Sequence, residues 1–386
     1  MSLEISVAKT KTELEDLFRF RYGIYIEEFR LSPLEADHKH KILRDYLDDY
    51  AISYVLRSQS KIVGSLRILF LEDIPCTQSL IKKFHLASAI DNFGLSAICA
   101  TSRFMVAPEL RHSRAIWKLM EAVYQDARQR GVRLNYGDCS PSLLPFYEHL
   151  GYRRYCPGYD DPSYGYKFPL LMLMEDVRGL TLVRSPLRRL ARRYTENHQV
   201  RQWFEREYPL YQELESAAFL SKEKFGEKVS QYLNTHSLYQ VSLFQGLKLT
   251  EIYKLLKGAT IIHTQVGDRI AKQGDYDKTL YILLSGIAKV TKNELVDEPF
   301  NLLGAGNTFV EIDIFKSGLC RANLISCSPS EVLVIPTESY QNIIEQEPEL
   351  ASKLILNLLC EMNYPKQVRK SFPILRLTTN LTTETV

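Results

Sequence analysis

The change of hydrophobic pattern along the chain most constrains what its 386 residues can fold into. Alternating strand-like and helix-like runs come first, a purely helical stretch follows, and short strands separated by glycine turns come last. Because these patterns bury their apolar faces in different ways, the sequence predicts an α+β multidomain chain. The predicted divisions are a mixed α/β domain at 1–180, a basic helical linker at 181–240, a β-barrel (jelly-roll) domain with flanking helices at 241–372 and a disordered tail at 373–386.

The first region contains three informative runs. "YAISYVLRSQSKIVGSLRILF" has two β-rich segments joined by the polar residues 57–61, which is a hairpin pattern. "AIWKLMEAVYQDARQRG" places Ile116, Leu119 and Val123 at helical spacing and ends at Gly131. "LNYGDCSPSLLPFYEHLGYRRY" then reads as strand, helix and strand. Together these runs predict a mixed α/β unit.

The helical stretch carries a cluster of arginines. "SPLRRLARRY" begins with Ser185 as the expected N-cap and Pro186 at the first helical position. The face of this predicted helix opposite its apolar stripe holds Arg188, Arg189, Arg192 and Arg193. Two interpretations stay open: a solvated face of a linker helix, or peripheral contact with an anionic carrier protein, a membrane surface or nucleic acid.

Composition narrows the classes of function. A formal net charge of +3 is too small for a nucleic-acid footprint over the whole surface. The seven cysteines show no Cys-x-x-Cys spacing that would suggest a zinc site or a redox pair, so no metal is expected and a reducing cytoplasm is the natural location. The start "MSLEISVAKTKTELEDL" lacks the pattern of a signal peptide, and no apolar run approaches the roughly 18 residues of a membrane span.

The barrel region resembles the cyclic-nucleotide-binding domains. The resemblance rests on "LFQGL", "GDRIAKQGD", "LYILLSG", "FVEIDIF" and "CRAN", in this order. It implies a phosphate-binding cassette in which Arg321 holds the cyclic phosphate of cyclic AMP or cyclic GMP through a partly buried guanidinium and Glu311 accepts the ribose hydroxyl. The cassette positions are Val310, Glu311, Ile312, Arg321 and Ala322.

Two residues depart from that family. Val310 stands where a glycine usually precedes the glutamate, and Asp313 adds a like charge near the phosphate. A weakened nucleotide pocket and a barrel that binds no nucleotide both stay open. Because no helix-turn-helix pattern follows the barrel, no DNA-binding domain is expected, and the output is expected in the first domain.

The first domain resembles the GCN5-related N-acetyltransferases through "SRFMVAPELRHSRAIWKLMEAV" and "LLPFYEHLGYRRY". The resemblance implies that a strand ending near Val106 splays from its neighbour to receive a pantetheine arm, and that Tyr147 protonates the leaving thiolate. The glycines of the family's pyrophosphate loop are replaced here by Arg114 and Ile116. The implied cofactor-binding positions are Arg103, Met105, Val106, Arg111, Ser113, Arg114 and Ala115.

The front of this domain resembles the acyl-homoserine-lactone synthases and the N-acyl amino acid synthases. The carrying segments are "FRFRYGIYIEEF", "DYLDDYAISYVL", "GSLRIL" and "SRF". The charged positions of the pattern are Arg21, Asp45, Asp48, Arg67 and Arg103. The resemblance implies acyl transfer from acyl carrier protein, rather than from acyl coenzyme A, to an amine such as an amino acid. Ala100 replaces the glutamate of the lactone synthases, which disfavours a homoserine-lactone product.

Simpler interpretations remain for these residues. Asp45 and Asp48 would bind or orient a cationic amine, or they would form surface salt bridges with the arginines. Tyr147 would be an acid, or a half-buried aromatic on an amphipathic helix. Cys139 is expected to be a buried thiol because no histidine motif accompanies it. For the whole chain, the alternative to an enzyme is a binding or scaffold protein with a degenerate cassette.

Overall fold

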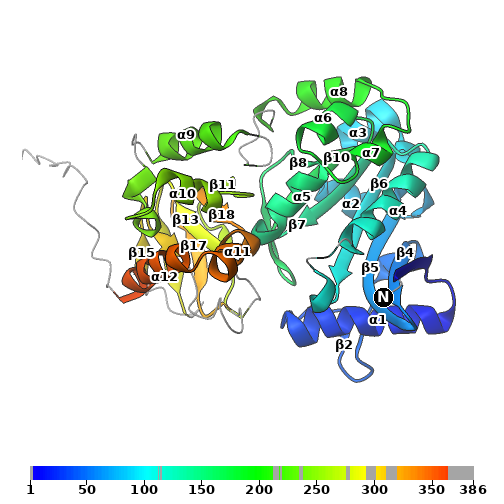
Figure 1. The fold of residues 1–386 in the computed structure, drawn as a ribbon. Helices are drawn as coiled ribbons and strands as arrows, with labels where there is room; N and C mark the ends of the chain where they lie inside the picture. The colour runs from blue at the N-terminus through cyan, green and yellow to red at the C-terminus, as the bar shows by residue number, and fades with distance from the viewer. Residues whose placement is uncertain are drawn as a thin grey trace, which may run out of the picture.

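The computed structural model describes residues 3–363 apart from 112, 114, 212–216, 218–219, 234–237, 275–278, 293–300 and 310–319. Figure 1 shows the blue to green half of the chain around one large sheet and the yellow to red half as a separate barrel beside it. None of the helices described by the structure is long and apolar enough to cross a membrane.

A central sheet organises the N-terminal domain. Its strands are β1 (Leu3–Val7), β4 (Ile52–Ser58), β5 (Lys61–Phe70), β6 (Ile98–Val106), β7 (Leu134–Cys139), β8 (Tyr152–Arg154), β9 (Tyr159–Asp161) and β10 (Gly165–Leu173), while β2 (Ala36–Asp37) and β3 (Ile42–Leu43) pair with each other. The order is β1-β4-β5-β6-β7-β10-β8, with β9 on β10. The pairing of β6 with β7 is parallel, and the other recorded pairs of this sheet are antiparallel.

The predicted hairpin and helix are confirmed. β4 and β5 pair down to Ser58 and Lys61, and Gln59 takes φ 57° in the tight turn between them. The helices of this domain are α1 (Lys11–Tyr22), α2 (Gln78–Lys83), α3 (Ala87–Phe93), α4 (Ala115–Gln129) and α5 (Leu144–Leu150). Leu119 and Val123 of α4 are fully buried, as their helical spacing predicts.

The helical stretch is shared between the two halves of the chain. It forms α6 (Val177–Leu182), α7 (Arg188–Ala191), α8 (Gln199–Glu207) and α9 (Lys222–Tyr232). Trp203 and Phe204 of α8 pack in a core with residues of the large sheet, whereas Phe225 and Val229 of α9 pack with residues of the barrel. α7 begins at Arg188, later than predicted, although the Ser185 hydroxyl accepts from the Leu187 N–H at 3.1 Å as an N-cap does. The same hydroxyl donates to the Leu150 carbonyl at 2.6 Å.

Two sheets of four strands each form the barrel. Their strands are β11 (Thr260–Thr264), β12 (Arg269–Ala271), β13 (Leu280–Leu283), β14 (Ala288–Thr291), β15 (Asn301–Leu303), β16 (Thr308–Phe309), β17 (Asn323–Ser326) and β18 (Ser330–Ile335). The orders are β11-β18-β13-β16 and β12-β17-β14-β15. α10 (Leu249–Leu255), α11 (Thr337–Gln346) and α12 (Pro348–Asn363) flank the barrel. The predicted fold class, a mixed α/β domain followed by a barrel with flanking helices, is confirmed.

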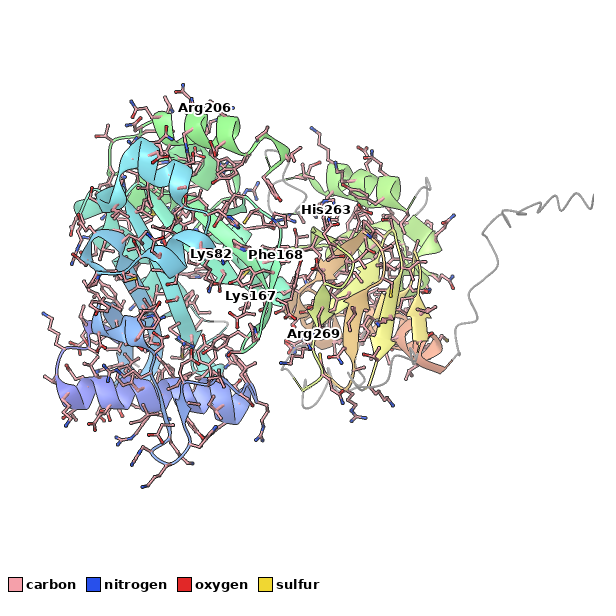
Figure 2. All side chains as sticks on the ribbon, turned by 180° about the vertical axis from the view of Figure 1, so that it is seen from behind. Lys82, Lys167, Phe168, Arg206, His263 and Arg269 are labelled. Carbon is pink, nitrogen blue, oxygen red and sulfur yellow. The ribbon has the colours of Figure 1, made fainter. Side chains whose placement is uncertain are left out.

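The barrel contacts the N-terminal domain through its strands β11 and β12. Arg154 donates to the Ile261 carbonyl at 2.7 Å, and Arg269 binds Asp160 at 2.8 Å. The Tyr166 hydroxyl donates to Asp268 at 2.7 Å. Figure 2 shows Arg269 at this junction, on the side of the barrel that faces the N-terminal domain. The hairpin formed by β9 and β10 therefore touches the barrel directly.

Candidate active site

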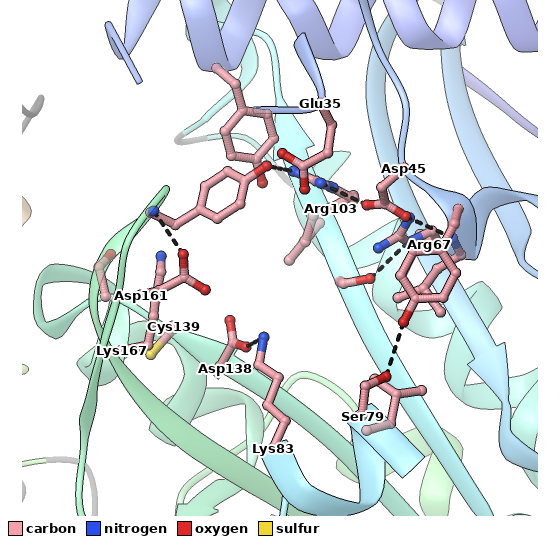
Figure 3. Close-up of a pocket in the computed structure, with 18 of the residues that line it drawn as sticks. Glu35, Asp45, Arg67, Ser79, Lys83, Arg103, Asp138, Cys139, Asp161 and Lys167 are labelled. Carbon is pink, nitrogen blue, oxygen red and sulfur yellow. Dashed lines mark hydrogen bonds and ion pairs between the residues drawn. The ribbon is translucent and has the colours of Figure 1, made fainter. Parts of the chain in front are cut away.

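A cavity of about 820 Å³ opens beside strands β6 and β7 of the N-terminal domain (Figure 3). Its walls come from residues 44–49, from α2, from the first turns of α5, from the two strands and from the hairpin of β9 and β10. These elements are far apart in the sequence, so the cavity exists only in the folded chain.

The two strands part at the cavity. Their parallel pairing is limited to Ile98–Ala100 against Leu134–Tyr136, although both strands continue beyond it. A Cβ on Gly137 would lie only 3.3 Å from the Thr101 carbonyl oxygen, so glycine allows the strands to approach closely just where they begin to part. The splay that the resemblance implies is thus present, and its pantetheine ligand stays a prediction.

β6 carries a bulge at the same level. Arg103 and Phe104 together oppose Leu66 of β5, because the register shifts between these strands. Arg103 has φ 53°, a left-handed conformation that costs a non-glycine residue about 1–3 kcal/mol. The contacts of its side chain offset this cost: its guanidinium donates to the Tyr164 hydroxyl at 2.7 Å and lies 5.3 Å from the centre of the Tyr25 ring.

Five charged side chains form one buried ion network next to the bulge. Asp45 binds Arg67 and Arg103, each at 2.7 Å. Asp48 binds Arg21 at 2.7 Å and Arg67 at 3.1 Å. The exposure of these side chains is 10% for Asp45, 4% for Arg67, 7% for Arg103, 2% for Asp48 and 0% for Arg21. They therefore form a buried network and are not surface salt bridges.

Local sequence places the two carboxylates. Residues Tyr46–Asp49 form a turn of 3-10 helix that Asp45 and Asp48 close as a capping box. The Asp45 carboxylate accepts from the Leu47 N–H at 3.0 Å, and the Asp48 carboxylate accepts from the Asp45 N–H at 3.0 Å. Burial alone would raise the pKa of Asp45, but Arg67 and Arg103 hold that pKa well below its usual range. Asp45 is thus a fixed anion at neutral pH.

The cavity brings together four of the predicted site residues. Asp45, Arg67, Arg103 and Tyr147 line it, whereas Arg21 and Asp48 do not and lie behind them in the network. Figure 3 shows Asp45, Arg67 and Arg103 on one wall of the cavity.

Tyr147 extends from α5 into the cavity. The helix begins with Pro145 in its first turn and ends at Gly151, whose φ of 111° makes the left-handed cap. The Tyr147 ring packs edge-on against Tyr152 at 5.4 Å, and its hydroxyl makes no hydrogen bond to the described residues. Burial raises the pKa of Tyr147 well above its usual value, so the phenol holds its proton at neutral pH. The hydroxyl is available to donate to a ligand.

Cys139 also lines the cavity, at the end of β7. Its side chain is buried, and burial raises the pKa of the thiol well above its usual value. Because the thiolate is the reactive form, this cysteine is a poor nucleophile. The expectation of a buried thiol is confirmed.

The remaining cofactor-binding positions lie along β6 and the segment that leads to α4. Met105 and Val106 are buried in the strand. Arg111 binds both oxygens of Glu28, at 2.6 and 2.7 Å, so its guanidinium is engaged within the chain. The Ser113 hydroxyl donates to the Leu110 carbonyl at 2.7 Å. Ala115 begins α4, and Arg114 lies outside the described residues.

Seven further charged residues line the cavity and were missed by the sequence analysis: Glu35, Arg44, Asp49, Lys83, Asp138, Asp161 and Lys167. Lys83 binds Asp138 at 2.7 Å across the cavity floor. The sequence did contain one signal for Asp138 as a site residue. It is a carboxylate near the end of the strand "LNYGDC", next to Cys139. The lysines carry no such signal, because they lie in other elements.

The nucleotide cassette of the barrel is described only in part. Val310, Glu311 and Ile312 lie outside the described residues, as does Asp313. Ala322 is buried, as is Cys320, whereas Arg321 between them is exposed. The sequence predicts a partly buried guanidinium at Arg321. Arg321 stands in the bend that precedes β17 (Asn323–Ser326), where its side chain is exposed between two buried neighbours.

Each half of the chain matches a known protein family. Residues 16–174 match the family described as N-acyl amino acid synthase FeeM, and residues 261–347 match the cyclic nucleotide-binding domain. Each match covers less than half of the chain and so describes one domain. A search of curated proteins found no match.

Solved structures resemble each half weakly. TofI, in a ternary complex with an inhibitor and MTA, is 17% identical with a TM-score of 0.38, over 47% of this chain and 97% of that chain. The AHL synthase LasI is 13% identical with a TM-score of 0.35, over 45% and 90%. The catabolite activator protein of Thermus thermophilus is 27% identical with a TM-score of 0.29, over 31% and 58%. The assignment depends on the two family matches and not on these scores.

The fold and the family match together define the class: the N-terminal domain is an N-acyltransferase domain. More particularly, it is of the N-acyl amino acid synthase type, and the chain joins it to a domain of the cyclic nucleotide-binding type.

Proposed function

We propose that the chain transfers an acyl group from a pantetheine thioester on acyl carrier protein to the amine of an acceptor such as an amino acid. The observation that carries the proposal is the gap between β6 and β7, which opens on a cavity that Tyr147 lines. A pantetheine arm in this gap would bring its thioester to the tyrosine and would leave the rest of the cavity for the acceptor.

The residues support a direct transfer. The acceptor loses one proton to solvent, and its neutral nitrogen attacks the thioester carbonyl carbon. The C–N bond forms, the C–S bond breaks, and the thiolate takes the proton of the Tyr147 hydroxyl. The phenolate then regains a proton from the nitrogen that has become the amide. The products are an amide and a free thiol, and the enzyme returns to its starting state.

Acyl carrier protein is the favoured carrier because the segment that would receive a pyrophosphate is poorly suited to it. In the acetyltransferases, glycines let backbone N–H groups reach the pyrophosphate at a helix N-terminus. Here the segment contains arginine and isoleucine in place of glycine, and Arg111 is held by Glu28. Acyl carrier protein presents a phosphopantetheine without the pyrophosphate.

We therefore expect a medium or long acyl group on acyl carrier protein to be transferred faster than acetyl from coenzyme A. Release of free thiol in the presence of an amino acid measures the rate. The same long acyl group on coenzyme A and acetyl on acyl carrier protein are the controls, because they separate chain length from carrier. A preference for acetyl coenzyme A would contradict the proposed carrier.

We also infer that the barrel regulates the transfer, because its contacts reach two walls of the cavity. Arg154, which donates to Ile261 of β11, also binds Glu148 at 3.1 Å, and Glu148 follows Tyr147 in α5. The hairpin of β9 and β10 binds β12 through Asp160 and also contributes Tyr164 to the cavity. A change in the position of β11 or β12 would thus act on the tyrosine and on the hairpin together.

Cyclic AMP or cyclic GMP at millimolar concentration is expected to raise the melting temperature of the barrel in the full chain. A ligand at a hundred times its dissociation constant adds about 2.7 kcal/mol of stability by mass action. Calorimetry of the full chain measures the melting temperature of the barrel. Arg321→Ala should abolish the shift, whereas Arg269→Ala should keep the shift and weaken its effect on acyl transfer. No shift with either nucleotide would favour a barrel that serves only as a docking module.

A further inference from the structure

Residues 178–193 contain six arginines and no acidic residue, and they lie just beyond the residues 16–174 that match the synthase family. Because the whole chain has a formal net charge of +3 and this segment carries +6, the other residues together carry −3. Five of the six side chains are exposed, and none of the six forms an ion pair with a residue that the structure describes. We call the exposed set the arginine surface: Arg178, Arg184, Arg189, Arg192 and Arg193.

The acids around this segment do not neutralise it. Glu175 and Asp176, which precede it, each bind two arginines of other elements. On the neighbouring helix α4 the exposed Lys118 and Glu121 balance each other in charge. Glu196, which follows the segment, is a single exposed acid beside six arginines. The arginine surface is therefore a local patch of positive potential.

Arg184 occupies the position at the end of α6 that glycine usually fills. The Ser185 N–H donates to the Leu180 carbonyl at 2.9 Å, and the Arg184 N–H donates to the Thr181 carbonyl at 3.1 Å, which is the Schellman pattern. Arg184 has φ 53°, a left-handed conformation that strains a residue with a Cβ and does not strain glycine. Glycine would serve this helix end better, so a role of the arginine side chain at the surface accounts for its presence.

α7 lies on the face of the large sheet opposite to α2, the helix that lines the cavity. Leu187 and Ala191 of the α7 segment share a core with α4, α5 and Cys99 of β6. Leu80 of α2 shares another core with Ala100, the next residue of β6. Neighbours in a strand point to opposite faces of the sheet. An acceptor in the cavity and a donor at the arginine surface would thus approach the gap between β6 and β7 from opposite sides.

Four half-buried rings connect the α7 side of the sheet with the cavity. Phe104 lines the cavity, and its ring centre lies 6.0 Å from that of Phe146 on α5. Phe146 stacks on Trp117 of α4 at 5.4 Å, and Trp117 lies 6.2 Å from His149 of α5. The Ser185 hydroxyl, just before α7, is bonded to the end of α5 at 2.6 Å. These rings give a pantetheine arm an apolar path from α7 to the gap.

We propose that the arginine surface docks the acidic surface of the acyl carrier protein that delivers the acyl group. The carrier protein binds over α6 and α7, and its arm follows the four rings to the gap. This inference rests on the proposed acyl transfer, whose donor it places on the molecule. The surface lies outside the residues of the synthase match, so the family match does not describe it.

The arginine surface suits an acidic protein better than a lipid surface. A helix that lies in a membrane interface needs a free apolar face beside its cations. Here Leu180, Leu187 and Ala191 are buried within the domain, and within 177–193 only Leu182 is an exposed large hydrophobic residue. The patch thus offers charge without the apolar face that lipid binding requires.

The test compares two donors of one long acyl group: acyl carrier protein, and a pantetheine thioester that lacks the protein. The triple variant Arg189→Gln, Arg192→Gln and Arg193→Gln is expected to raise KM for acyl carrier protein about ten- to a hundredfold, because three exposed charge pairs are lost. KM for the pantetheine thioester should stay unchanged, as should kcat with either donor. Added salt should raise KM for acyl carrier protein more steeply in the wild type than in the triple variant.

Arg184→Gly separates docking from folding. It removes the charge together with the strained conformation, so it should raise KM for acyl carrier protein about two- to fivefold without lowering the melting temperature. Lys41→Gly is the matched control, since Lys41 is 67% exposed and has φ 55°. It lies between β2 and β3, at the opposite end of the N-terminal domain from α7 (Figure 1). This control should leave KM for both donors unchanged.

An unchanged KM for acyl carrier protein in the triple variant, with an active wild type, would overturn the docking surface and leave acyl transfer intact. If the wild type and not the triple variant also sediments with phosphatidylglycerol vesicles, that result would assign the arginines to a membrane surface instead. A wild type that releases thiol from neither donor would overturn the proposed function itself.

Discussion

Replacement of Tyr147 by phenylalanine should lower kcat for acyl transfer by about a hundred- to ten-thousandfold, the usual contribution of a general acid. Tyr147 lines the cavity, and its phenol keeps its proton because burial raises its pKa. Without it the thiolate must leave unprotonated. KM for the donor should change little, because the aromatic ring and its packing on Tyr152 remain.

A second thioester donor distinguishes a Tyr147 that acts as a general acid from a Tyr147 with only a structural role. An aryl thioester releases a weakly basic thiolate that needs no proton, so Tyr147→Phe should impair its transfer much less. Tyr46→Phe is the control, since it removes another cavity hydroxyl, one that bonds to Ser79 at 3.0 Å. Equal losses with both kinds of thioester would mean that Tyr147 acts through packing alone.

Asp48→Asn should lower the free energy of unfolding of the N-terminal domain by about 3–5 kcal/mol, the cost of breaking a buried ion pair by removing one partner. The substitution leaves Arg21, which is 0% exposed, without its carboxylate, and it also removes a contact of Arg67 at 3.1 Å. Urea denaturation measured by tryptophan fluorescence reports on this domain, because both tryptophans, Trp117 and Trp203, belong to the cores around its sheet.

The neighbouring Asp49 provides the control. Its side chain is 54% exposed and pairs with Arg44 on the surface. Asp49→Asn should therefore change stability by less than about 1 kcal/mol. Equal stabilities of the two variants would show that the burial of the network contributes nothing. Full stability with lost transfer in the Asp48 variant would instead assign Asp48 a direct part in binding.

The sequence located much of the candidate site but not its arrangement. Asp45, Arg67, Arg103 and Tyr147 were identified through short motifs, and they do line one cavity. The same motifs grouped Asp48 with them, although it supports the wall from behind. A motif specifies residue types and their spacing. Whether a side chain lines the cavity or lies behind the lining residues depends on which other residues pack against it.

Lys83, Asp138 and Lys167 show what motif reasoning could not reach. They belong to α2, β7 and β10, and only the folding of these elements around one cavity brings them together. The ion pair of Lys83 with Asp138, at 2.7 Å, is a property of these three-dimensional surroundings.

By itself the sequence determined the kinds of element and the order of the two domains, because periodicity, caps and turn glycines act over a few residues. The hairpin of β4 and β5 and the helix α4 follow from such local rules. Only the tertiary structure decided the burial of the ion network, the outward position of Arg321 and the contact of Arg154 with β11. Each of these depends on which distant segments pack together and exclude water, and no short stretch of sequence records that.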